Sequence, residues 1–202
     1  MSSPRSGIPH YWVALRAMLV LTAVLGVGYP LVITGIGQLA LPAQANGSTE
    51  TVDGVTVGSA LLGQSFADAD GDPLPEWFQP RPSAAGDGYD GGASSGSNYG
   101  PENADLIATI EERKAQIAEF NGVDPVDIPA DALTASASGL DPHISPEYAL
   151  LQVRRVAAER NLAVADVQAL VQSHIQARDL GYLGEPTVNV LQLNIALEAL
   201  TA

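Results

Sequence analysis

The sequence contains no cysteine, few aromatic residues and few basic ones. Without cysteine no disulfide bond stabilises the chain, although a chain of this length buries a hydrophobic core without such help. Nine Lys and Arg residues stand against 23 Asp and Glu residues, so the formal net charge is −14. Because binding to nucleic acid requires a basic surface, this balance excludes nucleic acid as a partner.

One stretch near the amino terminus lacks charge altogether. Residues 17–37, AMLVLTAVLGVGYPLVITGIG, are 21 consecutive residues without Asp, Glu, Lys or Arg. A helix of that length rises about 30 Å, which is the thickness of the hydrocarbon core of a bilayer. It also lacks the polar stripe of a helix packed on a soluble core. We therefore predict a transmembrane helix over residues 13–38.

The interior of this helix is rich in small or helix-breaking residues, among them Gly26, Gly28, Pro30 and Gly35. Such residues are tolerated in lipid mainly where neighbouring helices cover the freed backbone groups. The pattern predicts packing against other membrane helices. The alternative is a simple anchor with a kink at Pro30.

A cleaved signal peptide is the main rival explanation of the apolar stretch. Arg5 and Arg16 form a basic start, and Ala43-Gln44-Ala45 resembles a cleavage box. However, the apolar run exceeds the usual length of about 7–15 residues, and the box lies some distance beyond its end. We expect the helix to be retained.

The flanking charges predict the orientation. Arg5 and Arg16 precede the span without any acidic residue, and the first basic residue after it is Arg81. The amino end should therefore stay in the cytoplasm, with the protein a single-pass component of the plasma (inner) membrane. The expected organisation is a cytoplasmic tail at 1–12, the helix, a flexible juxtamembrane linker at 39–51 and an extracytoplasmic domain at 52–202. The part beyond residue 37 holds all 23 acidic and seven basic residues, a net charge of −16.

The outer domain is predicted to be a single α+β domain with a small β-sheet packed by several helices. Asp53-Gly54 between β-branched residues indicates a tight turn within a strand pair. Helices are expected over about 103–120, 146–160 and 164–177, with a last one from Val190. Ser145 and Pro146 have the order of an N-cap and first helical residue. The small-residue run 134–146 before them, with two prolines, should be irregular.

Gly92-Ala93-Ser94-Ser95-Gly96 matches the G-x-S-x-G pattern of a serine hydrolase, and Asp141 and His143 follow in the right chain order. That motif requires an apolar strand directly before it, whereas Asp87, Gly88 and Asp90 precede it here. A serine hydrolase using Ser94, Asp141 and His143 is therefore the alternative function, and an ordered glycine-rich loop is the favoured interpretation.

Two other ligand motifs fail on their details. Residues 68–72, DADGD, resemble the start of a calcium loop, but Pro73 and Gln79 stand where that loop needs Gly and Glu. The glycine-rich run 86–100 lacks the lysine and the preceding strand of a phosphate-binding loop. We expect no metal ion and no cofactor bound by this chain.

Six blocks between Gly58 and Asn194 carry a family resemblance: GSALLGQSF, WFQPRPSA, SSGSNYGPEN, IPADALTASASGLDPHISP, QVRRVAAER and GEPTVNVLQLN. In this order, after one amino-terminal membrane helix, they resemble the KdpC family, the C subunits of Kdp potassium-transporting ATPases. The resemblance covers nearly the whole chain.

The resemblance implies an accessory, non-catalytic subunit of a high-affinity potassium uptake complex. Its implied partners are a channel-like subunit (KdpA) that carries K⁺, a P-type ATPase subunit (KdpB) that binds ATP and Mg²⁺, and a single-helix subunit (KdpF). It implies roles in assembly and in raising the ATP affinity of the pump subunit, with Gly63-Gln64 or Gln152 as conceivable contacts. The predicted orientation argues against direct contact with cytoplasmic ATP.

Ordered Gly/Pro/Ser loops often carry function on a rigid scaffold. We therefore expect the loops 81–98 and 136–146 to form much of the contact surface for partners. Asp141 and His143 have the alternative role of shaping their loop locally, and Asn194 lies on an apolar helix face, where a hydrogen-bonded core role is favoured. The candidate contact residues are Gly63, Gln64, Arg81, Pro82, Ser83, Ser97, Asn98, Ser138, Gly139, Asp141, His143, Gln152, Asn189 and Asn194.

Overall fold

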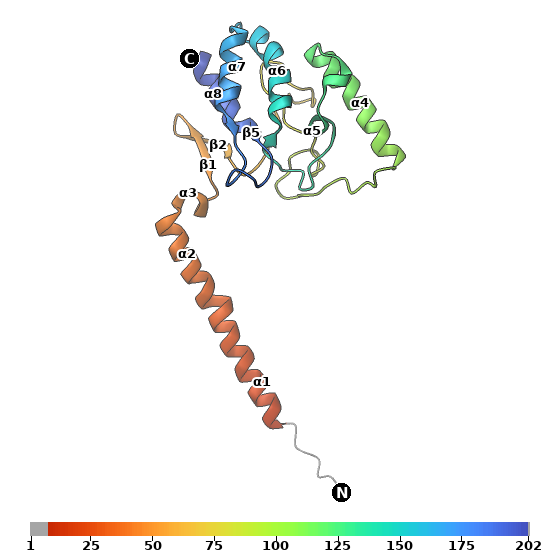
Figure 1. Cartoon of the computed structure of the whole chain (residues 1–202). Helices are drawn as coiled ribbons and strands as arrows, with labels where there is room; N and C mark the ends of the chain where they lie inside the picture. The colour runs from red at the N-terminus through yellow and green to blue at the C-terminus, as the bar shows by residue number, and fades with distance from the viewer. Residues whose placement is uncertain (1–7, 202) are drawn as a thin grey trace. The chain divides into compact units, whose positions relative to one another are not determined.

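The computed structural model of the chain describes residues 8–201 and divides into two units, one ending at Ser48 and one beginning at Thr49 (Figure 1). The first unit is dominated by one long helix. A helical turn, α3, follows that helix in the first unit, and the second unit contains α4 to α8 and both small sheets. Most of the predicted tail, residues 1–7, lies outside the described residues.

The long helix consists of α1 (Ile8–Leu21), a π-helical segment η1 (Thr22–Gly28) and α2 (Tyr29–Ala40). Within its stretch His10–Ala40, the most apolar window of 18 residues has a mean hydropathy of 2.1, and none of that window is buried. The π-helical turn falls just before Pro30, where the Tyr29 N–H reaches back to the Val24 carbonyl. Proline lacks an N–H and crowds the preceding turn, and the wider π turn accommodates it within an unbroken helix. The predicted amino-terminal apolar helix is present and is long enough to cross a membrane.

The segment after α2 is more ordered than its small polar composition predicted. Pro42–Ala45 forms the helical turn α3, and the side chains of Gln38 and Asn46 exchange two hydrogen bonds at 3.2 and 3.1 Å. The Asn46 amide also donates to the Pro42 carbonyl at 2.7 Å. These side-chain hydrogen bonds join the turn α3 to the end of α2.

The second unit opens with a two-stranded antiparallel sheet, β1 (Thr49–Val52) and β2 (Val55–Ser59). Asp53 and Gly54 connect the strands with φ of 51° and 79°. Two consecutive left-handed residues suit the twist of a two-residue hairpin, as the Asp-Gly pair predicted. The following residues up to Phe66 form turns and irregular chain.

A second sheet, which the sequence did not predict, consists of β3 (His143–Ile144), β5 (Thr187–Asn189) and β4 (Ile175–Gln176), in the order β3-β5-β4 with antiparallel pairs. The single predicted sheet is thus replaced by two small ones. The flanking prolines do not prevent β3, since each lacks only an N–H and the Pro142 carbonyl accepts the Val190 N–H at 3.0 Å.

Four helices agree well with the predicted positions: α4 (Ala104–Asn121), α6 (Pro146–Glu159), α7 (Val164–Ser173) and α8 (Val190–Thr201). The short helix α5 (Ala130–Leu133) and a 3₁₀ turn at Pro125–Asp127 were not predicted. Asn103 caps the start of α4, and Gly122 ends it in the left-handed conformation. Ser145 caps α6 as predicted, accepting the Tyr148 N–H. The helix expected over 164–177 stops at Ser173 because the chain enters β4.

The hydrophobic core lies among α6, α7, α8 and β5. Its completely buried members include Phe78, Val156, Val167, Val171, Val188, Leu193 and Leu197. Leu150 of α6 and Leu200 of α8 are exposed, although both continue the apolar spacing of their helices. In α6 the neighbouring positions Ala149, Gln152 and Val156 face the core instead.

Two buried amides bind a short extended segment to the helices. Asn194 of α8 accepts the Phe78 N–H and donates to the Phe78 carbonyl, both at 3.0 Å. Gln152 of α6 does the same for Gln79, at 2.7 and 3.1 Å. Consecutive residues of an extended chain point their backbone groups to opposite sides, so one amide on each side is required. The core role predicted for Asn194 is confirmed.

An arginine binds the chain just before this extended segment. Arg155 of α6 donates to the carbonyls of Pro75 and Trp77 and to the side chain of Gln152, and its guanidinium lies 4.4 Å from the centre of the Phe120 ring. Burial lowers the pKa of Arg155 to about 10, so it remains charged at neutral pH. Several carbonyl oxygens thus replace its water shell.

Candidate functional site

Three irregular segments meet beside the second sheet, contributed by residues 60–66, 81–98 and 134–142. The Gly63 N–H donates to the Leu140 carbonyl at 2.8 Å. A Cβ on Gly63 would lie 2.5 Å from Cε1 of Tyr89 and 2.6 Å from the Asp141 carbonyl oxygen. Since real contacts are longer than this, the close approach of all three segments depends on glycine at position 63.

Gly139 is a second point of close approach. Its φ is +69°, and a Cβ there would lie 2.7 Å from both the Ala85 nitrogen and the Ser95 carbonyl oxygen. The Ser95 N–H donates to the Ser138 carbonyl at 2.9 Å, and the Ser83 hydroxyl donates to the Gly139 carbonyl at 2.6 Å. The two long loops predicted as a contact surface are therefore bound to each other.

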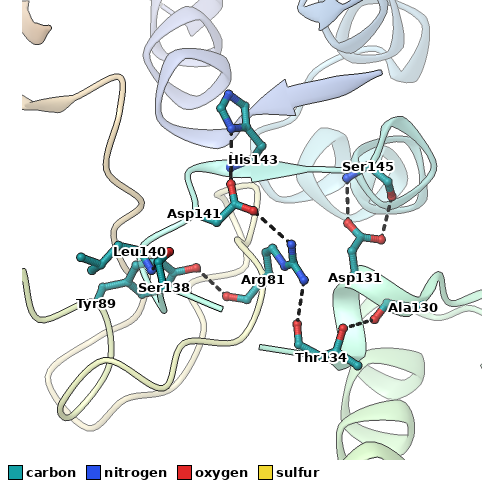
Figure 2. Close-up of polar contacts among 10 residues, drawn as sticks. All are labelled: Arg81, Tyr89, Ala130, Asp131, Thr134, Ser138, Leu140, Asp141, His143 and Ser145. Atoms are coloured by element: carbon teal, nitrogen blue, oxygen red, sulfur yellow. Dashed lines mark hydrogen bonds and ion pairs between the residues drawn. The ribbon is translucent and has the colours of Figure 1, made fainter. Parts of the chain in front are cut away.

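Ser83 and Tyr89 shape the loop that begins at Arg81. The Ser83 oxygen accepts the N–H groups of Ala85 at 3.1 Å and Tyr89 at 2.8 Å. The Tyr89 hydroxyl donates to the Arg81 carbonyl at 2.5 Å (Figure 2). Burial, reinforced by the charge of Asp141, raises the pKa of Tyr89 above its usual value, so the phenol stays neutral and serves as a donor.

The charged centre of the site is the group Arg81, Asp141 and His143 (Figure 2). Arg81 Nη1 lies 3.0 Å from Asp141 Oδ2, and Arg81 Nη2 donates to the Thr134 carbonyl at 3.3 Å. Asp141 Oδ1 accepts the His143 N–H at 3.0 Å and lies 3.3 Å from His143 Nδ1. The Asp141 carboxylate thus joins the loop at Arg81 to the start of β3.

The environment of Asp141 favours its ionised form. Burial by itself raises the pKa of Asp141, but the hydrogen bonds from the His143 side chain and backbone and the charge of Arg81 outweigh burial, so the net pKa lies below its usual value. Asp141 is an anion at neutral pH. The predicted local role of Asp141 and His143, shaping their own loop, is what the contacts show.

A second carboxylate attaches this region to helix α6. Asp131 of α5 accepts the Ser145 N–H at 2.7 Å and the Ser145 hydroxyl at 2.8 Å, while the Ser145 oxygen caps α6 (Figure 2). Asp131 therefore connects α5 to the capped start of α6. The loop 134–142 sits on a rigid base.

An open hollow of about 680 Å³ lies over the junction of the three segments. Its apolar rim includes Leu61 and Leu62, which are 61% and 47% exposed, and polar groups of Arg81, Ser138 and Asp141 contribute to its wall. Exposed leucines beside convergent polar groups are typical of a surface that contacts another molecule.

The hydrolase alternative gains no support from this geometry. The chain before Ser94 is a series of turns and not a strand, and the Ser94 hydroxyl donates to the Ser138 carbonyl at 2.9 Å. Within residues 8–201, no group of three or more His, Asp or Glu side chains is placed to hold a metal ion. The predicted calcium-like segment 68–72 is an exposed loop in which Asp68 accepts two backbone N–H groups of its own loop.

The predicted contact residues separate into three groups. Gly63, Arg81, Ser83, Ser138, Gly139, Asp141 and His143 lie together at the junction. Pro82 and Gln64 are half-buried beside neighbouring hollows, and Ser97 and Asn98 are exposed. Gln152, Asn189 and Asn194 are buried and use their amides within the domain, Asn189 by donating to the Ala60 carbonyl and capping α8. We leave these three out of the proposed surface.

Sequence reasoning missed Tyr89, Asp131 and the two rim leucines. A lone tyrosine among glycines in GDGYDGG was the available signal for Tyr89, because an aromatic in such a run has few partners except a neighbouring loop. The pair Leu61-Leu62 between glycines did not indicate exposure, because a short buried strand has the same sequence pattern. Asp131 has no local signal for its bond to a residue 14 positions away.

One helix long and apolar enough to cross a membrane, joined to a small acidic α+β domain, defines a class: single domains with one candidate membrane helix at the amino end. A family model described as KdpC, the K⁺-transporting ATPase c chain, matches residues 11–199. The chain belongs to the KdpC family.

Individual relatives agree with this assignment. The chain is 56% identical to the potassium-transporting ATPase KdpC subunit of Kineococcus radiotolerans, covering 92% of this chain and 91% of that protein. It is 49% identical to the KdpC subunit of Mycobacterium bovis, with 93% and 96% covered, and 47% identical to that of Beijerinckia indica, with 95% and 94% covered.

Proposed function

We propose that this chain is the non-catalytic, membrane-anchored subunit that stabilises the assembly of the ion-translocating and ATP-hydrolysing subunits of a potassium uptake complex. The observation that carries the proposal is the extent of the family match. It runs from residue 11 to residue 199 and includes the apolar helix and nearly the whole domain. A helix shared by the family supports a retained anchor over a cleaved signal peptide.

The orientation is part of the proposal. Arg5 and Arg16 stand before the helix and all acidic residues stand after it, which favours a cytoplasmic amino end and an extracytoplasmic domain. The domain then lies across the membrane from cytoplasmic ATP. An effect on the ATP affinity of the pump subunit would be indirect, and the burial of Gln152 is in keeping with that.

The implied partners are subunits of the KdpA, KdpB and KdpF types. The exposed side chains of the long helix, with the glycines 26, 28 and 35 along it, suit close packing against other membrane helices. The hollow over Arg81 and Asp141, rimmed by Leu61 and Leu62, is the proposed contact surface of the domain. The net charge of −16 beyond residue 37 would raise the local concentration of cations near an ion entrance, and selectivity would belong to the channel-like partner.

Growth at limiting potassium tests this function. A strain that lacks this chain and carries no other potassium uptake system should grow in micromolar potassium only when the chain is supplied. Replacing the rim with Leu61→Asp and Leu62→Asp should abolish this rescue, whereas Val126→Asp, at a residue 77% exposed elsewhere on the domain, should not. Full rescue by the double rim variant at equal expression would refute the proposed surface.

A further inference from the structure

The loop between β4 and β5 displays apolar side chains that nothing in the domain covers. Leu180 is 80% exposed, Tyr182 is 69% exposed and Leu183 is 49% exposed. We call residues 178–185 the apolar loop. Three large apolar side chains within four residues of one loop form a local patch, unlike single exposed residues, which are ordinary on a protein surface.

This loop is held in one shape by its own hydrogen bonds. Asp179 and Leu183 exchange two backbone hydrogen bonds, at 3.0 and 2.9 Å, and the Gly181 N–H donates to the Arg178 carbonyl at 3.0 Å. Arg178 and Glu185 form an ion pair across its base. The apolar side chains are therefore displayed by an ordered turn, which lowers the entropy lost when a partner binds.

The backbone of the loop is also strained in a way that its own packing does not explain. Leu180 has a φ of +53°, a left-handed conformation that is unfavourable for any residue other than glycine. Its side chain is the most exposed of the three, so burial within the domain does not offset that cost. This conformation presents the Leu180 side chain to the outside of the domain, where another molecule can contact it.

The position of the apolar loop in the domain indicates which kind of molecule it can contact. In Figure 1 the chain between β4 and β5 descends to the edge of the domain at which β1 begins. Thr49 follows the end of the membrane helix by only eight intervening residues, so β1 begins within roughly 30 Å of that end. A membrane subunit that emerges slightly from the bilayer can reach this edge.

Charge disfavours lipid as the occupant. The loop carries two acidic residues and one basic residue, in a part of the chain with a net charge of −16. An anionic lipid surface repels such a domain, whereas surface loops that insert into lipid headgroups usually carry an excess of Lys or Arg. Tyrosine and leucine on a preformed loop instead suit an apolar hollow on a protein, where aromatic residues are the preferred anchors.

We infer that the apolar loop, through Leu180, Tyr182 and Leu183, docks into an apolar hollow on the extracytoplasmic face of an integral membrane subunit of the same complex. This inference rests on the proposed function, because it requires that the chain assembles with such subunits. It defines a second contact, separate from the hollow at Arg81 and Asp141.

Photocrosslinking in the assembled complex tests the inference. A photoreactive benzoylphenylalanine is placed at Tyr182, or in a second variant at Leu183, and the tagged full chain is irradiated in native membranes and purified. The matched control carries the same group at Val126, which is also apolar and 77% exposed. The expected result is a covalent adduct between position 182 or 183 and another subunit, identified by mass. The control with the photoreactive group at position 126 should form no such adduct.

Adducts with lipid alone, no adduct, or equal adducts from Val126 would overturn the inference when the other subunits still copurify with the chain. If no subunit copurifies with the unmodified chain, the proposed function itself has failed. The two failures are thus distinguished by the same purification. As a second measurement, the triple variant Leu180→Ser, Tyr182→Ser, Leu183→Ser should lose copurifying subunits while its own thermal unfolding temperature is retained.

Discussion

Arg81 and Asp141 are 60 residues apart in the sequence, yet Nη1 of the arginine lies 3.0 Å from Oδ2 of the aspartate. This pair joins two long loops that have almost no regular structure of their own. Both side chains are partly exposed, at 22% and 31%, so the pair contributes through geometry more than through a large Coulomb energy. It fixes the wall of the hollow that we propose as a contact surface.

Asp141→Asn should lower stability in a manner that depends on pH. The pKa of Asp141 is lower in the folded protein than its usual value, so its stabilising contribution is present above the unfolded pKa and is lost as pH falls through the folded pKa. At pH 7 the variant should be less stable by about 1 kcal/mol, a value discounted for exposure. Thermal unfolding of both full chains in detergent should show this difference shrinking below about pH 4. A difference that grows towards acid would contradict the assignment.

Gly63→Ala should separate the loops at the site. The new methyl group would meet Tyr89 and the Asp141 carbonyl, and relieving that overlap should cost about 1–3 kcal/mol. Gly91→Ala is the matched control, since a Cβ there meets nothing and its φ is ordinary, so its effect should stay within about 0.5 kcal/mol. Tryptophan fluorescence during thermal unfolding measures both. Equal stability of the two variants would show that the segments are not packed as described.

Asn194→Ala should be among the more destabilising substitutions in the domain. It leaves the buried N–H and carbonyl of Phe78 without their partners, at a cost of about 2–4 kcal/mol. Gln152→Ala should behave similarly through Gln79. The control is Gln116→Ala on the exposed side of α4, whose amide bonds only to Glu112. Urea unfolding midpoints provide the comparison. An unchanged midpoint for Asn194→Ala would contradict the role of Asn194 in holding the segment at Phe78.

Ser94→Ala should leave growth at limiting potassium unchanged. The Ser94 hydroxyl makes one hydrogen bond to the Ser138 carbonyl from an exposed position, worth about 1 kcal/mol or less. The complementation assay described for the rim variants measures this directly. Loss of growth together with labelling of Ser94 by a fluorophosphonate probe would restore the hydrolase alternative.

The helices were predictable because their signals are local. Asn103 and Gly122 delimit α4, and Ser145 begins α6, within one turn of the residues that they cap. The Asp53-Gly54 hairpin is equally local. By contrast, β3, β4 and β5 are two or three residues long and exist only through pairing with one another, so no periodicity could indicate them.

The sequence predicted several residues of the site, but it did not predict how they contact one another. The Gly/Pro/Ser composition of two loops pointed to Arg81, Ser83, Gly139 and Asp141, but the contacts that join these residues span more than 50 residues and leave no trace in spacing. Gln152, Asn189 and Asn194, which were also predicted as candidate contacts, are buried. Their amides instead satisfy backbone groups of irregular segments, a need that appears only once the fold is known.

Affinity purification of the tagged full chain from detergent-solubilised membranes of potassium-starved cells, with intact mass of the chain, tests the central claim most directly. The account predicts that a pump subunit and a channel-like subunit copurify and that the amino terminus is uncleaved. A chain that begins at Asn46 and is recovered alone would contradict it.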